Sequence, residues 1–119
     1  MAVQSYKDLI VWQKAIGLVT NVYRCTKGFP KDELYGLTSQ LRRAAVSVPC
    51  NIAEGQGRVS TGEFKQFLGH ARGSLHEMQT QLVIAENLGY LDKTEKDRLL
   101  EDSTEVDRML NRLISSLAI

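Results

Sequence analysis

Four segments of the chain repeat apolar residues every three or four positions, which is the spacing of one face of an α-helix. Short stretches rich in glycine, proline and capping residues separate the segments, and together they account for nearly all of the 119 residues. We predict helices over residues 5–27, 36–54, 61–88 and 93–117. Such similar lengths, about 30 to 38 Å each, with short connections favour an all-α, antiparallel up-down four-helix bundle in one domain.

The ends of these helices carry their own sequence signals. Ser60 with Glu63 and Asp92 with Glu95 have the spacing of N-terminal capping boxes, and Ser5 with Asp8 is a similar pair at the start of the first helix. A glycine at position 89 is suited to close the third helix.

The first predicted helix carries two apolar seams instead of one. We expect the first seam to face the bundle core; it consists of Leu9, Trp12, Ile16, Val19 and Tyr23. The second seam runs beside it and consists of Val11, Ala15, Leu18, Val22 and Cys25. Together they make half of the helix circumference apolar, which is wider than the face that a bundle helix buries. We interpret the surplus as an oligomer contact and predict contact residues at Val11, Leu18 and Val22.

The second predicted helix contains a proline within its apolar seam. Pro49 removes the amide that would bond the Ala45 carbonyl, at a cost of about 3 kcal/mol in a helix interior. We predict that Ser47 and Asn51 help to satisfy this carbonyl.

A polar stripe runs beside that seam, within one narrow sector of the second helix. Its residues are Gln40, Arg43, Ser47, Asn51 and Glu54. We predict that they form a structural hydrogen-bond network between helices or subunits, in which Arg43 pairs with Glu77 or Glu86. The alternative is a ligand site.

Charge is balanced overall but uneven along the chain. The net charge of +1 gives no strong nucleic-acid signature. Residues 1–60 nevertheless carry +4 and residues 61–119 carry −3. The candidate nucleic-acid contacts are Lys7, Lys14, Arg42 and Arg58, and ordinary solvated surface is the alternative.

The sequence lacks the motifs of common catalytic and metal sites. Neither His70 nor His76 has the Glu-x-x-His spacing of a di-iron bundle, HExxH is absent, and the two cysteines form no CxxC pair. We therefore expect no catalytic residue, metal, cofactor or small-molecule substrate. No apolar run approaches the length of about 20 residues that a membrane span needs, and no cleavable leader is recognisable, so we expect a cytoplasmic protein without membrane contact.

Three stretches resemble the bacterial 23S rRNA intervening-sequence protein family, also called the four-helix bundle protein family. They are SYKDLIVWQKA (5–15), FPKDELYGLTSQLRRAAVSVPCNIAEGQGR (29–58) and GSLHEMQTQL (73–82). The similarity covers almost the whole chain, and its central signature is YGLTSQLRRAAVS followed by NIAEG. Cys50 stands where the family usually has alanine or serine.

This resemblance implies four-helix bundles that build ring-shaped homopentamers, without enzymatic activity. Genes of this type occur inside insertions of some bacterial 23S rRNA genes. A related family, the accessory proteins of diversity-generating retroelements, pairs with a reverse transcriptase and binds nucleic acid through a basic surface. We therefore expect a noncatalytic homo-oligomeric scaffold or adaptor that binds RNA or a reverse-transcriptase-like protein. The alternative is a purely structural oligomer with a protein partner and no nucleic-acid role.

Overall fold

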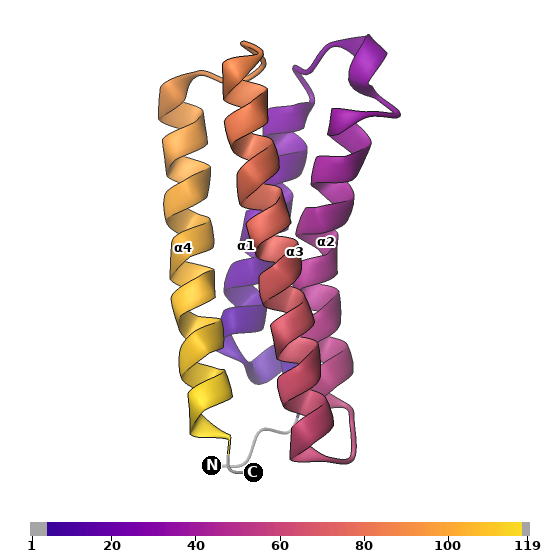
Figure 1. Ribbon diagram of the computed structural model, residues 1–119, viewed down its shortest axis with the longest axis vertical. Helices are drawn as coiled ribbons and strands as arrows, with labels where there is room; N and C mark the ends of the chain where they lie inside the picture. Colours follow the sequence, from indigo (N-terminus) through magenta and orange to yellow (C-terminus); the bar gives the residue numbers. More distant parts are fainter. Residues whose placement is uncertain (1–4, 118–119) are drawn as a thin grey trace.

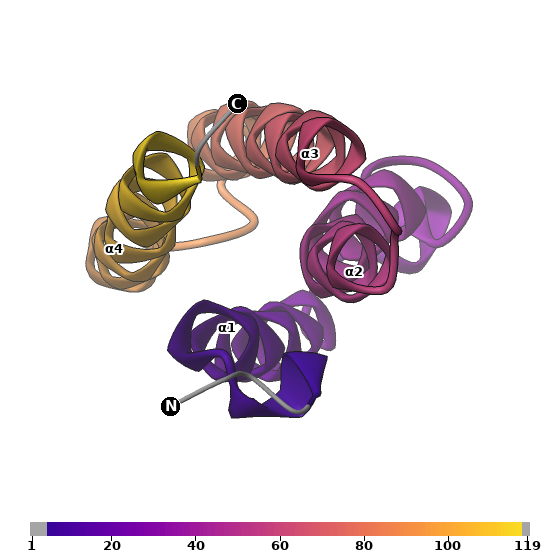
Figure 2. The ribbon, with the colours of Figure 1, turned by 90° about the horizontal axis from the view of Figure 1, so that it is seen from below.

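The computed structural model describes residues 5–117, and every regular element in that range is helical. The elements are η1 (Tyr6–Asp8), α1 (Ile10–Thr26), η2 (Lys31–Glu33), α2 (Leu37–Gln56), α3 (Thr61–Asn87) and α4 (Lys93–Ser116), where η denotes a short 3-10 helix. Figure 1 shows the four α-helices side by side, with successive helices joined at alternating ends of the molecule. Figure 2 shows that they follow one another around the bundle in chain order, so that α1 also packs against α4.

The predicted signals at the starts of α3 and α4 are confirmed. The Ser60 hydroxyl accepts a hydrogen bond from the backbone amide of Glu63 at 3.1 Å, and the Asp92 carboxylate accepts one from the amide of Glu95 at 2.7 Å. Each bond satisfies an amide that the first turn of a helix leaves without a partner. Gly89 follows α3 with φ of +80°, a conformation that side chains disfavour, so it ends that helix as expected.

The start of the first helix differs from the prediction. Ser5 caps η1 through a 3.2 Å bond from the amide of Lys7, and Leu9 then adopts an extended conformation before α1 begins. The Tyr6 ring packs edge-on against Trp12, with 5.2 Å between the ring centroids, so η1 folds back beside α1. The predicted range 5–27 therefore merges two elements.

The core is a continuous cluster of aliphatic side chains from all four helices, joined at one end by Phe29 and Leu91. The α1 residues that enter it are Val11, Ala15, Leu18 and Val22, each at most 4% exposed. Ile16 and Tyr23, from the seam expected in the core, are 39% exposed. The prediction that Val11, Leu18 and Val22 contact another subunit is therefore wrong, because the other helices of the same chain bury them.

Helices α2 and α3 approach each other closely where the NIAEG motif ends. A Cβ atom at the buried Gly55 would lie 2.7 Å from Cβ of Phe67 and 3.0 Å from a ring carbon of Phe64. Only glycine fits at that separation, since such short contacts force neighbouring atoms to move.

Helix α2 continues through Pro49. The side-chain amide of Asn51 donates to the carbonyl and the hydroxyl of Ser47, at 2.8 and 2.9 Å. The prediction that Ser47 and Asn51 help to satisfy the Ala45 carbonyl is therefore wrong.

Among the described residues, no helix has the length and apolar character that crossing a membrane requires.

Candidate functional site

Part of the predicted polar stripe lines a groove between α2 and α3. The groove has a volume of about 550 Å³ and is lined by Gln40, Arg43, Ala44, Ser47, Ser74, Glu77 and Gln81. The Ser74 hydroxyl donates to the Ser47 hydroxyl at 2.9 Å, which joins the two helices. The Asn51 side-chain amide donates to the same Ser47 hydroxyl oxygen. The structure thus contains the part of the predicted network that joins Ser47, Asn51 and Ser74.

The charged members of the stripe do not join that network. Glu86 pairs with Lys96 at 3.0 Å, and no ion pair joins Arg43 to any carboxylate of residues 5–117, although Glu77 lines the same groove. The predicted pairing of Arg43 is therefore wrong. Glu54 instead bonds Arg58 at 2.8 Å, one turn along the chain.

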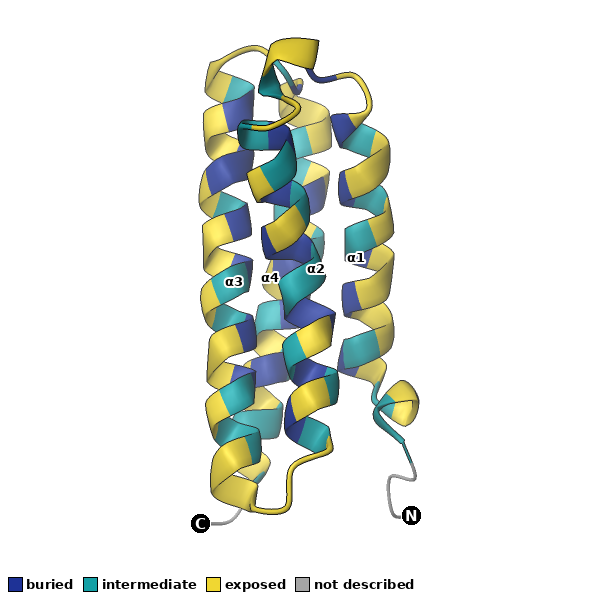
Figure 3. Cartoon of the chain, turned by 90° about the vertical axis from the view of Figure 1, so that its right-hand side faces the viewer, coloured by how far each residue is buried: buried dark blue, intermediate teal, exposed yellow. Residues whose placement is uncertain are grey.

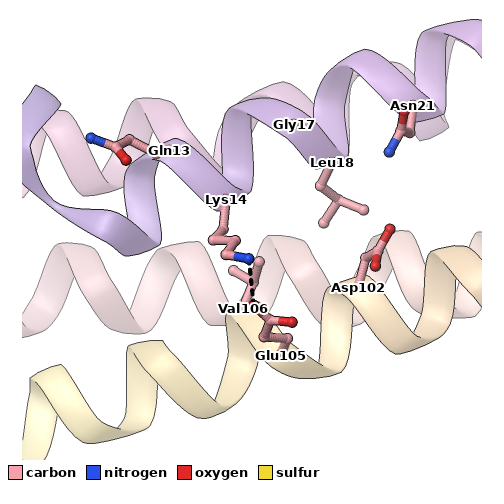
Figure 4. Close-up of a pocket in the computed structure, with 8 residues that line it drawn as sticks. All are labelled: Gln13, Lys14, Gly17, Leu18, Asn21, Asp102, Glu105 and Val106. Atoms are coloured by element: carbon pink, nitrogen blue, oxygen red, sulfur yellow. Dashed lines mark ion pairs between the residues drawn. The ribbon is translucent and has the colours of Figure 1, made fainter.

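Lys14, a candidate nucleic-acid contact, is paired within its own chain. Its ammonium lies 3.0 Å from the Glu105 carboxylate, across the α1/α4 groove drawn in Figure 4. Both side chains are about half exposed, and an ion pair of that kind contributes little to stability. The neighbouring carboxylate of Asp102 makes this groove unfavourable for a phosphate.

Of the other three candidate basic residues, Arg42 lies toward one end of the bundle, whereas η1 with Lys7 and the α2/α3 connection with Arg58 lie toward the other. Arg42 donates to the Thr26 hydroxyl at 2.8 Å near the C-terminal end of α1, and its guanidinium lies 4.6 Å from the centre of the Tyr23 ring. Arg58 follows α2 and lies over the ring of Phe67 at the opposite end of the bundle. Lys7 belongs to η1. The four predicted contacts therefore do not form one basic surface.

Three basic side chains gather at the end of the bundle that holds η2, next to the acidic Asp32 and Glu33 of η2 itself. A groove of about 260 Å³ there is lined by Thr26, Lys27, Phe29, Pro30, Lys31, Leu34, Thr38 and Arg42. Thr38 is 4% exposed, and its hydroxyl oxygen has no hydrogen-bond partner. Tyr35, just after η2, is 92% exposed. We name Lys27, Lys31, Tyr35 and Arg42 the basic end. The candidate contacts predicted from the sequence did not include Lys27 and Lys31, although their spacing around the turn after the first helix was an available signal.

The most apolar groove lies between α1 and α2, on the side of the molecule that Figure 3 turns toward the reader. It has a volume of about 260 Å³ and is lined by Tyr6, Trp12, Ile16, Val19, Val46, Pro49, Cys50 and Ala53. None of these residues is charged, and the exposed parts of Ile16 and Cys50 lie among them. The seam of α1 that contains Trp12 and Ile16, which we expected in the core, thus faces outward.

The ionisable side chains of the middle of the bundle tie helices together. Arg72 of α3 bonds the Asp107 carboxylate of α4 at 2.8 Å, and His76 lies 3.3 Å from the same oxygen. Burial raises the pKa of Asp107, but the hydrogen bond and charge of Arg72, aided by His76, bring it below the ordinary value.

The Cys25 thiol lies beside a carboxylate, with its sulfur 3.8 Å from an oxygen of Glu95. Burial, followed by the neighbouring Glu95 carboxylate, raises the pKa of Cys25, which lowers the reactivity of that thiol at neutral pH. Within residues 5–117, no three His, Cys, Asp or Glu side chains cluster as metal ligands would.

Comparison with known proteins agrees with this architecture. A crystal structure of a protein with unknown function from the S23 ribosomal protein family of Bacteroides thetaiotaomicron VPI-5482 superposes with a TM-score of 0.84. The two sequences are 20% identical, and the match covers 90% of this chain and 96% of that one, which shows a shared fold. No curated protein matches the sequence. The family model described as 23S rRNA-intervening sequence protein matches residues 7–112. The chain belongs to the 23S rRNA-intervening sequence protein family.

Proposed function

We propose that this protein is a noncatalytic scaffold that assembles from several copies of itself and presents a basic, aromatic end to RNA. The observation that carries the assembly is the α1/α2 groove, whose eight lining residues include a tryptophan, a proline and four aliphatic residues and no charge. A contiguous apolar groove on the outside of a small protein marks an interaction site.

Tryptophan at this position is a strong anchor for an interface. Trp12 is only partly buried by its own chain and packs against Tyr6 on one side. Aromatic residues that keep exposed area at the centre of an apolar surface dominate binding energy in protein interfaces. The family resemblance implies a ring of five subunits, and we adopt that number for the assembly.

Size measurement tests the assembly. We expect wild-type protein to sediment as an oligomer at micromolar concentration, whereas Cys50→Arg places a charge in the groove and yields a folded monomer of 13.3 kDa. Cys50 is exposed, so the larger side chain needs no space in the core. Wild-type protein that remains monomeric would refute the assembly.

Contact with RNA is the second part of the proposal, and the basic end supports it. Lysine and arginine side chains beside an exposed aromatic ring are the combination that binds single-stranded nucleic acid, through phosphates and base stacking respectively. Lys27, Lys31 and Arg42 supply the positive charge, and Tyr35 supplies the ring. In a ring, the copies of this end would act together, which offsets the small net charge of one subunit.

Titration of a labelled single-stranded RNA measures this part separately. The double variant Lys27→Ala/Lys31→Ala should weaken binding and reduce the dependence of affinity on salt, because fewer counterions are released. Lys14→Ala is the matched control, since Lys14 is paired with Glu105. Absence of binding at low salt would remove the RNA role. A purely structural oligomer, or an adaptor for a reverse-transcriptase-like protein, would then take its place.

A further inference from the structure

The centre line of the outer face of α3 carries no charge, although the exposed Glu63 and Glu77 lie to its sides. The exposed residues along its centre are Gly62, Gln66, Gly69, Gly73, Thr80, Ile84 and Asn87. We call this the α3 face. The exposed side of α4 provides the contrast, because it carries many acidic and basic side chains, among them Glu101, Glu105, Arg108 and Arg112. A solvated helix surface resembles α4, so the composition of the α3 face needs another explanation.

The glycines of the α3 face have no use within the chain. A Cβ atom added at Gly62, Gly69 or Gly73 would meet nothing within 4 Å, and none of the three has a positive φ. Each glycine inside a helix lowers the helix-forming equilibrium roughly four- to five-fold relative to alanine. The chain thus carries this cost at positions where its own packing and backbone would accept a side chain.

Apolar side chains are exposed on and beside the same face. Val83 and Ile84 are each 42% exposed, and Leu88, directly after α3, is 53% exposed. None of them is covered by another helix of the bundle, since α3 has neighbours only on its α2 and α4 sides. The α3 face therefore has glycines without side chains over residues 62–73 and exposed aliphatic side chains over residues 83–88.

We propose that the α3 face of one subunit docks into the α1/α2 groove of a second copy. This inference rests on the proposed assembly and specifies which two surfaces meet. Both surfaces are free of charge along their centres, and the exposed Glu77 flanks the α3 face, where it can stay at the solvated rim of the contact. Glycines on the incoming helix let its axis come close to the bulky side chains of Trp12 and Ile16 that line the groove.

The dimensions allow a small contact. From Gly69 to Leu88 the α3 face is about 28 Å long. A helix of about 10 Å diameter that buries half of its lateral surface over that length, with the matching groove, accounts for roughly 900 Å² in total, which is the size of a weak interface. The two surfaces also lie on different sides of the bundle, as Figure 2 shows for α3 and α1, so one subunit can use both. A contact of this head-to-tail kind closes into a ring or continues as a filament.

The test uses two variants that each block one surface. Cys50→Arg blocks the groove, and Gly73→Arg blocks the α3 face at a position with open space around it. Gly69→Arg serves as a second blocked α3 face. Gly17→Arg is the matched control: Gly17 is also an exposed helical glycine with nothing within 4 Å, but it lies on the α1/α4 side, outside both surfaces. Circular dichroism establishes that each variant is folded before its mass is measured.

We expect Cys50→Arg and Gly73→Arg each to lower the association constant about 100-fold or more, and Gly17→Arg to assemble as wild type. An equimolar mixture of the two blocked variants should form a complex of two subunits and no larger species, because each contributes one intact surface. Assembly of Gly73→Arg and Gly69→Arg like the wild type would overturn this inference, while monomeric Cys50→Arg would still support the proposed assembly. A mixture that stays monomeric would show that these two surfaces do not pair. Wild-type protein that is itself monomeric would overturn both proposals.

Discussion

Replacement of Gly55 by alanine tests the close approach of α2 and α3 that the NIAEG motif permits. The new methyl carbon would lie 2.7 Å from Cβ of Phe67 and 3.0 Å from a ring carbon of Phe64. The first of these atoms is fixed by the backbone of α3, so a side-chain rotation cannot relieve the contact. Either the helices separate or the methyl group stays compressed, and overpacking of this kind costs about 1–3 kcal/mol.

The steric cost of the new methyl group is partly offset by the higher helix preference of alanine, which must be subtracted. Alanine favours the helical conformation over glycine by about 0.8–1 kcal/mol. Gly17→Ala is the matched control, because Gly17 is also helical, lacks a positive φ and has nothing within 4 Å of a Cβ atom. Gly17→Ala should therefore stabilise the protein by nearly the full helical preference, and the difference between the two variants isolates the steric cost.

Urea unfolding followed by circular dichroism at one protein concentration measures both free energies of unfolding. We expect Gly55→Ala to be less stable than Gly17→Ala by about 1–3 kcal/mol. The unfolding slope should be unchanged, since the surface exposed on unfolding is the same. Equal stabilities would refute the reasoning, because they would mean that α2 and α3 do not meet closely at this glycine.

Four further predictions concern ion pairs, thiols and the tryptophan. Asp107→Asn should destabilise the protein by about 1 kcal/mol at pH 7, measured by urea unfolding, because it weakens the bonds from Arg72 and His76. Since the pKa of Asp107 is lowered in the folded state from the ordinary 3.8, its stabilisation is complete above that pH and disappears as the pH falls through the folded value. The gap between wild type and Asp107→Asn should thus begin to narrow below about pH 4 and close as the pH falls through the lower folded pKa, and a gap that does not narrow below about pH 4 would contradict this assignment. Glu105→Gln should change stability by less than about 0.5 kcal/mol, because its pair with Lys14 is half exposed, and a larger loss would show that the pair is tighter than described. Cys50 should react with Ellman's reagent faster in the Gly73→Arg monomer than in the assembled wild type. Cys25 should react slowly in both, because burial and Glu95 raise its pKa. Mass spectrometry of the labelled peptides separates the two thiols. Trp12 is the sole tryptophan, so its fluorescence should shift to longer wavelength when dilution separates the subunits, and an unchanged spectrum across dissociation would place it outside the interface.

The helices of this protein could be predicted from its sequence because the apolar spacing and the capping residues indicate the same helix boundaries. Ser60 and Asp92 accept the bonds from Glu63 and Glu95 that the capping pattern predicts. The break at Leu9 was not predictable in the same way, since it depends on Tyr6 reaching back to Trp12. Local patterns define elements well when nothing distant competes with them.

The orientation of α1 could not be derived from its own pattern. Its two seams are adjacent and similarly apolar, and which one enters the core depends on where the other helices lie. The seam with Ala15 faces inward, and the seam with Trp12 faces outward. The apolar width of α1 was predictable from its sequence, but the seam that enters the core was not.

Pairing between distant charges was equally hidden from the sequence. Lys14 meets Glu105 from the last helix, and Arg43 lacks the carboxylate partner that its position in the stripe suggested. Short side chains were more predictable, because Ser47 and Asn51 lie one turn apart on the same helix and bond each other directly.

Sedimentation velocity of wild-type protein beside Cys50→Arg, over a range of concentrations, shows whether the α1/α2 groove joins the subunits. We expect wild type to sediment as a discrete oligomer and the variant to sediment as a folded monomer of 13.3 kDa at the same concentration. Wild-type protein that sediments as a monomer throughout, or a variant that assembles as wild type does, would contradict the claim that the α1/α2 groove joins the subunits.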